Sequence, residues 1–181
     1  MVKKSEKLRP HKPYGREPRA LGMDPKTAAK ARVNDLRTSF KNTRETAHAV
    51  KGMQLRDAQA YLQDVLEHKR CIPYTRYRYG IGQTAQAKER GWSAMGRWPK
   101  KSIDAVLGLL SSAEAVAELR AQNSKTMRIE HIQVNRARNI RRRTYRAHGR
   151  VGAFESSPCH VELFLAPKQA AVPKPTSAPQ K

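Results

Sequence analysis

The segment 127–166, MRIEHIQVNRARNIRRRTYRAHGRVGAFESSPCHVELFLA, decides the fold of this chain. Near its end, apolar residues occupy every second position from Val161 to Leu165, and this alternation predicts a β-strand over 159–166. Near its start, 127–135 has apolar residues on both faces. This second strand therefore requires a β-bulge near His131.

The 23 residues 136–158 between these strands are too many for a tight turn. Two alternatives follow for an antiparallel pair. The segment is either a disordered loop or a long two-stranded arm, with legs of about 11 residues that extend on the order of 35 Å.

The middle of this segment is rich in arginine. Asn135–Val151 contains seven arginines and neither an acidic residue nor a lysine. Arginine binds phosphate through two parallel hydrogen bonds and stacks on bases, so its use here favours RNA binding over a merely solvated charge run. Tyr145 offers a face for base stacking, and Gly149 permits a tight reversal. The predicted RNA-binding arginines are Arg136, Arg138, Arg141, Arg142, Arg143, Arg146 and Arg150.

A second basic zone covers residues 70–101 and has a formal charge of +7. Tyrosines alternate with arginines in YTRYRY, and aromatic rings beside cations suit unstacked RNA bases. The alternative is that the aromatic residues pack a long loop onto the body. For Trp92 and Trp98 both interpretations remain open. The candidate RNA-binding residues of this zone are Arg76, Arg78, Trp98, Lys100 and Lys101.

The composition of the whole chain limits the size of its core and indicates the kind of partner it binds. The 181 residues have a formal charge of +22, so a polyanionic partner is expected. Leu, Ile, Val and Phe make up only about 17% of residues, a fraction that supports one small core. The proline-containing basic ends, residues 1–30 and 168–181, are predicted to be an extended N-terminal arm and a flexible C-terminal tail.

Three helices are predicted between the ends. The first begins at an N-cap, Thr43, and ends at Gly52, and the second follows from Leu55 with apolar residues at helical spacing. The third has Pro99 in its first turn and an apolar stripe over 103–117.

Other function classes find no support in the sequence. The two cysteines are far apart and the six histidines are scattered, so neither a zinc site nor a disulfide framework is expected, and His160 is assigned a structural role. Nucleotide-binding loops, catalytic triads and paired catalytic carboxylates are also missing. We therefore expect no enzyme activity, metal, cofactor or small-molecule substrate. No apolar run suits a membrane span or a secretory signal, so a cytoplasmic location is expected.

Five runs of residues carry a resemblance to a known family. The chain is similar, over about Ala31–Pro167, to the large-subunit ribosomal protein family numbered twenty-two in the universal scheme and seventeen in the older eukaryotic one. The runs are FKNTRETAHAVKGM (Phe40–Met53), GRWPKKS (Gly96–Ser102), IEHIQVN (Ile129–Asn135), RRRTYRAHGR (Arg141–Arg150) and SSPCHVE (Ser156–Glu162).

The resemblance implies an α+β fold over 31–167. Its compact body would have three helices on a small three-stranded antiparallel sheet, with a long protruding β-hairpin at 134–160 and extended basic termini. The third strand would come from residues near 32–40, where the sequence alternates poorly.

The resemblance also implies a function. The chain would be a structural constituent of the large ribosomal subunit that binds large-subunit rRNA, supports its assembly and contacts neighbouring large-subunit ribosomal proteins. The hairpin would line the exit tunnel and meet the nascent polypeptide, with Tyr145, Arg146 and His148 facing the tunnel. The protein would be cytosolic and assemble in the nucleolus. The alternative is a free-standing basic RNA-binding protein or RNA chaperone.

Overall fold

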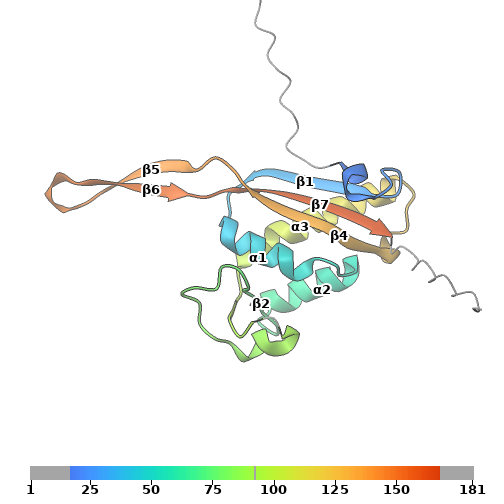
Figure 1. The fold of residues 1–181 in the computed structure, drawn as a ribbon, viewed down its shortest axis with the longest axis horizontal. Helices are drawn as coiled ribbons and strands as arrows, with labels where there is room; N and C mark the ends of the chain where they lie inside the picture. Colours follow the sequence, from blue (N-terminus) through green and yellow to red (C-terminus); the bar gives the residue numbers. More distant parts are fainter. Residues whose placement is uncertain (1–16, 92, 168–181) are drawn as a thin grey trace, which may run out of the picture.

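The computed structural model describes residues 17–91 and 93–167 and has the α+β fold that the sequence predicts (Figure 1). Three α-helices and seven strands are formed within these residues. The helices are α1 (Phe40–Val50), α2 (Leu55–Leu66) and α3 (Lys100–Leu119), and the strands are β1 (Ala29–Leu36), β2 (Ile72–Pro73), β3 (Gly96–Arg97), β4 (Met127–Arg136), β5 (Ile140–Tyr145), β6 (Val151–Ser156) and β7 (Cys159–Pro167). Short 3-10 helices are η1 (Pro18–Leu21), η2 (Ala85–Arg90), η3 (Ser124–Thr126) and η4 (Ala147–Gly149).

The body is built on a three-stranded antiparallel sheet of order β1-β7-β4. The central strand β7 carries the alternating residues Val161, Leu163 and Leu165, all of which are buried. The three helices pack against one face of this sheet (Figure 1). The predicted arrangement of three helices on three strands is therefore confirmed.

The opposite face of the sheet is also partly covered. The alternation in β7 predicts that Phe164 points away from the helices, yet it is fully buried against Met23 and Ala28. The carboxylate of Glu162 on the same strand is also buried and lies 3.6 Å from the Arg32 guanidinium. Met23 and Ala28, which belong to the predicted N-terminal arm, thus pack over the outer face of β7. Residues 1–16 and 168–181, the rest of the predicted arm and the tail, lie outside the described residues.

Both outer strands of the sheet are irregular. The register between β4 and β7 shifts between Ile129 and His131, which confirms the predicted bulge. Strand β1 ends earlier than the expected 32–40, and its register shifts between Val33 and Leu36. Asp35 in this bulge has a φ of +50°. This interruption explains why residues near 32–40 show no clean alternation.

Two helix starts differ from prediction. Helix α1 begins at Phe40 after an N-cap at Ser39, so Thr43 lies within its first turn. The Thr43 hydroxyl is buried and lies within hydrogen-bond distance of the carbonyl of Ser39 and the hydroxyl of Ser102, a contact between helices that local sequence does not reveal. Pro99 is the N-cap of α3 and does not lie in its first turn.

Gly96 lies in the short strand β3, where it pairs with Pro73 of β2. A Cβ atom at this position would lie 2.7 Å from Cys71 Sγ and 3.2 Å from Ala87 Cβ. Gly96→Ala is expected to lower the free energy of unfolding by about 1 to 3 kcal/mol, because overpacking forces neighbours to move. Gly108→Ala is the control: it meets nothing within 4 Å inside α3 and should stabilise by up to about 1 kcal/mol. Equal stabilities of the two variants in urea unfolding would contradict this packing.

Candidate nucleic-acid interface

The pairing of β4 with β7 continues outward as a two-stranded ribbon, defined here as residues 137–158. Beyond the pair Arg136–Cys159, the amide of Ala137 donates to the carbonyl of Pro158 at 3.0 Å. Strands β5 and β6 then pair antiparallel, and the ribbon protrudes from one end of the body (Figure 1). Of the two alternatives for this segment, the long arm is the one formed.

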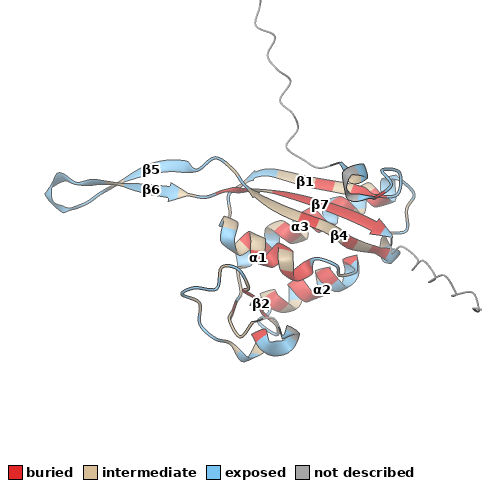
Figure 2. Ribbon diagram, in the orientation of Figure 1, coloured by how far each residue is buried: buried red, intermediate tan, exposed pale blue. Residues whose placement is uncertain are grey.

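Both faces of the ribbon are exposed (Figure 2). Since residues directly opposite in an antiparallel pair share a face, no inner side is available for a core. Tyr145 is 77% exposed, Val151 55% and Phe154 54%. An isolated two-stranded hairpin is marginally stable in water. One face carries Ile140, Arg142, Thr144, Gly152, Phe154 and Ser156, and the other carries Arg141, Arg143, Tyr145, Val151, Ala153 and Glu155.

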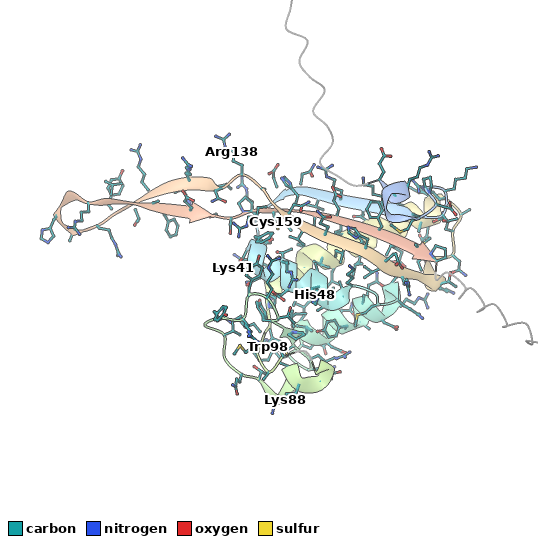
Figure 3. All side chains as sticks on the ribbon, in the orientation of Figure 1. Lys41, His48, Lys88, Trp98, Arg138 and Cys159 are labelled. Carbon is teal, nitrogen blue, oxygen red and sulfur yellow. The ribbon has the colours of Figure 1, made fainter. Side chains whose placement is uncertain are left out.

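The ribbon holds six arginines and a single acidic residue, Glu155. Two arginines are oriented from within the ribbon: Arg142 lies over the Phe154 ring at 4.9 Å, and Arg141 Nε lies 3.6 Å from the Glu155 carboxylate. Within residues 17–91 and 93–167, the side chains of the other four form no hydrogen bond, ion pair or ring contact. These are Arg138, Arg143, Arg146 and Arg150. Figure 3 shows Arg138 directed away from the ribbon.

The ribbon ends in a tight turn at η4. Ala147 is followed by two residues with positive φ, His148 at +59° and Gly149 at +68°. The amide of Arg146 donates to the carbonyl of Arg150 at 2.7 Å and closes the turn. Gly149 therefore supplies the predicted reversal. The three residues expected to face a tunnel, Tyr145, Arg146 and His148, are all exposed at this end of the ribbon.

The second basic zone mostly packs onto the body. Tyr74 is fully buried, and burial raises its pKa to about 12. Trp98 is half-buried, with its indole N–H donating to the Arg70 carbonyl at 2.8 Å and its ring centroid 5.0 Å from that of His68. Trp92 lies outside the described residues. Arg76, Arg78, Lys100 and Lys101 are exposed.

Comparison with known proteins identifies the family. The family model described as ribosomal protein L22p/L17e matches residues 31–166. The chain belongs to this family. It is 53% identical over 152 residues to the large ribosomal subunit protein uL22 of Suberites domuncula, which covers 83% of this chain and 80% of the relative. The chain is also 51% identical over 152 residues to the large ribosomal subunit protein uL22 of Dictyostelium discoideum, an alignment that covers 84% of each chain. It is 48% identical over 161 residues to the uL22 protein of Zea mays, which covers 89% of this chain and 92% of the relative.

The resemblance drawn from the sequence is thus confirmed, and the chain is a ribosomal protein of the L22p/L17e family, which is not a family of enzymes. Within the described residues there is no group of three or more His, Cys, Asp or Glu side chains able to hold a metal ion. No helix in that part of the chain is long and apolar enough to cross a membrane.

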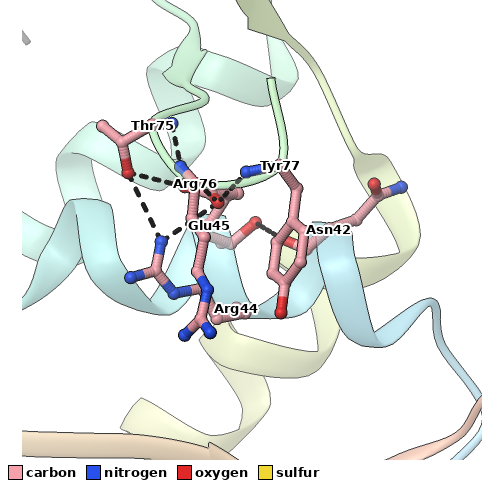
Figure 4. Close-up of polar contacts among 7 residues, drawn as sticks. Asn42, Arg44, Glu45, Thr75, Arg76 and Tyr77 are labelled. Carbon is pink, nitrogen blue, oxygen red and sulfur yellow. Dashed lines mark hydrogen bonds and ion pairs between the residues drawn. The ribbon is translucent and has the colours of Figure 1, made fainter. Parts of the chain in front are cut away.

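In this L22p/L17e protein, Glu45 of α1 organises the second basic zone (Figure 4). Its buried carboxylate accepts hydrogen bonds from the amides of Thr75, Arg76 and Tyr77 at 3.0 to 3.2 Å and from Arg44 at 3.0 Å. Burial alone would raise the pKa of Glu45, but the amides of Thr75 and Tyr77 and the Arg44 guanidinium outweigh it and lower the pKa. The carboxylate therefore stays ionised and fixes the loop that presents Arg76.

A chain of cation and ring contacts joins this loop to the root of the ribbon. The Arg136 guanidinium lies 5.0 Å from the Phe40 ring centroid, and Phe40 meets Tyr77 edge to face at 6.0 Å. Lys41 and Arg76 lie 5.9 and 5.6 Å from the Tyr77 ring. These rings already have cations against them, so the surface is better suited to phosphates than to base stacking.

No sequence signal marked Glu45 or Lys41. Glu45 is a charged residue within a helix, and only the loop that comes to it through space gives it a role. Lys41 does not stand in a basic run. His160 has the predicted structural role: its Nδ1 accepts from the Asp35 amide at 3.1 Å.

Proposed function

We propose that this chain is a structural constituent of the large ribosomal subunit that binds large-subunit rRNA, supports its assembly and lines the polypeptide exit tunnel with the tip of its ribbon. One observation carries the proposal: a two-stranded ribbon bare on both faces, with six arginines and one acidic residue. In water, neither face of such a ribbon is packed against other protein atoms. A groove in a folded polyanion would contact both faces of the ribbon and hold it in this shape.

The ribbon binds by neutralising phosphates. Each neutralised phosphate releases counterions, so log affinity falls by about 0.7 to 0.9 per contact for each decade of salt. The guanidinium groups of Arg136, Arg138 and Arg141–Arg143 bind phosphates, while the exposed Tyr145 ring can stack on a base. Because RNA supplies the contacts that the ribbon lacks, binding and ordering of the ribbon are one event.

The body provides a second contact surface. Arg76 and Arg78 are held out by the loop that Glu45 fixes, and Lys100 and Lys101 stand at the start of α3. These four cations bind phosphates, and the half-buried Trp98, two residues before Lys100, is held by its indole hydrogen bond to the carbonyl of Arg70. Neighbouring ribosomal proteins contact the remaining body surface.

The turn at η4 is the part of the ribbon that meets the nascent polypeptide. Tyr145, Arg146 and His148 give it a cationic and sterically bulky surface. Such a surface narrows the passage and slows segments that carry bulky or cationic side chains. The protein acts in the cytosol, and its assembly into subunits takes place in the nucleolus.

A shortened ribbon tests this assignment. Joining Thr144 to its partner Gly152 through Asn-Gly removes the tip residues 145–151, spares Arg141–Arg143 and keeps the strand register, since Asn-Gly favours the tight hairpin turn. The body should fold with unchanged stability, and the variant should still sediment with large subunits. Translational pausing on stalling peptides should change, as read by ribosome profiling. Unchanged pausing would remove the tunnel role.

The same sedimentation gradients distinguish a ribosomal constituent from the alternative, a free-standing RNA-binding protein or RNA chaperone. A ribosomal constituent sediments one to one with large-subunit rRNA and is scarce as a free protein. A free-standing RNA chaperone would exchange between RNAs and remain mostly unbound at the top of the gradient.

A further inference from the structure

Two hollows flank the root of the ribbon, where it leaves the body. The first, of about 570 Å³, is bordered by Arg37 between β1 and α1, Lys101 at the start of α3, and Arg142 on the ribbon. The second, of about 670 Å³, shares Arg37 and adds Arg138 and Arg141. Cations from the body and from the ribbon thus converge on the first hollow from three separate elements.

The first hollow has an excess of positive charge. Its single acidic residue, Glu155, already accepts from Asn139 at 3.1 Å and lies 3.6 Å from Arg141. Arg142 is held in place by its contact with Phe154 and its hydrogen bond to Ser156. Among the described residues, Arg37 and Lys101 have no side-chain partner. Two cations are therefore available to a ligand, and a third is oriented beside them.

Hydroxyl groups complete the lining. Ser39 is the N-cap of α1, but its side chain makes no capping hydrogen bond to that helix. Ser39 and Ser157 both border the hollow. Guanidinium, ammonium and hydroxyl donors around an open hollow suit a phosphate group, and the bidentate fork of Arg37 or Arg142 matches two phosphate oxygens.

We propose that Arg37, Lys101 and Arg142 clamp one backbone phosphate of RNA in this hollow, so that the RNA strand bridges body and ribbon. The proposal rests on the proposed function and adds to it a specific site. A polynucleotide fits better than a free anion, because the hollow is open and a separate hollow farther along the ribbon is bordered by Arg141, Arg142 and Arg143.

The site would set the direction of the ribbon. Strand pairing is interrupted between the pair Ala137–Pro158 and the pair Ile140–Ser156, so the ribbon joins the body through an unpaired link. A phosphate held from both sides of this link fixes the angle between ribbon and body. Arg37, which lies on the body and borders both hollows, is the residue on which this coupling most depends.

Phosphate ethylation interference on large-subunit rRNA tests the proposal with the full chain. The variants are Arg37→Ala, Lys101→Ala and the double variant, with Arg56→Ala on α2, an exposed position away from the ribbon, as the control. Each single variant should weaken binding about 3- to 10-fold, and the double variant should weaken it by less than the product, because the two cations share one phosphate. The same ethylated position should stop interfering in both single variants.

The outcomes separate the site from the proposed function. If the wild-type chain binds rRNA and the interference maps of wild type and variants are identical, the clamp is wrong and the proposed function stands. If the wild-type chain does not bind rRNA specifically, both are wrong. Inorganic phosphate at constant ionic strength could also compete with rRNA for the chain. If it does so and the ethylation interference map does not change, the hollow binds a free anion and the assignment to the RNA backbone is overturned.

Discussion

Replacing Arg141, Arg142 and Arg143 together with alanine is expected to reduce affinity for large-subunit rRNA by about 100-fold, which corresponds to about 1 kcal/mol for each lost phosphate contact. The slope of log affinity against log salt should fall by about 2 to 3. Filter binding across a salt series measures both quantities. In cells, incorporation of the variant into large subunits should fall in parallel, as seen in sucrose gradients.

The triple lysine variant is the matched control for this effect. It keeps the charge, so the salt slope should stay near that of wild type, but lysine cannot form the bidentate contact of arginine. An intermediate affinity is therefore expected. If the triple alanine variant sediments with subunits like wild type in high salt, these arginines do not bind phosphate and the ribbon account is wrong.

The second large effect is on stability. Glu45→Ala should lower the free energy of unfolding by about 3 kcal/mol, because three loop amides and Arg44 lose a buried charged partner at once. Glu118→Ala, at an exposed acidic position on α3, should change it by less than about 0.5 kcal/mol. Urea unfolding of the two purified variants at neutral pH measures the difference.

The pH dependence of stability checks the ionisation of Glu45. Because its pKa in the folded state is below the ordinary value of 4.5, its stabilising effect is complete above that value and is lost as pH falls through the folded-state pKa. Wild type should therefore lose stability more steeply than Glu45→Gln as the solution is acidified below 4.5. Parallel curves for the two proteins would show that the carboxylate is not specifically stabilised.

The strands at the two ends of the ribbon could be predicted because their information is local. Apolar residues alternate over 159–166, and the bulge near His131 follows from apolar residues on both faces of one strand. The residues between these strands left a disordered loop and a long arm open, and the hairpin was expected from the family resemblance. The second and third helices follow from apolar spacing in the same way. Such patterns depend on residues close together in the sequence.

The features that could not be predicted depend on contacts between residues that are far apart in the sequence. Phe164 alternates like an outward-facing residue and is buried only because residues 23–28 fold over it. Thr43 resembles an N-cap but is buried between α1 and α3, and Ser39 takes the cap position. Glu45 and Arg37 acquire their surroundings from a loop and a ribbon that are distant in sequence. No local sequence pattern indicates that these distant segments come together.

Hydrogen exchange of the ribbon amides, in the free chain and in large subunits, tests the central claim most directly. We expect the amides of β5 and β6 to exchange almost unprotected in the free chain while those of β7 stay protected, and all of them to become protected in the subunit. Ribbon amides as protected as β7 amides in the free chain, or unprotected in the subunit, would contradict the claim that RNA gives the ribbon its shape.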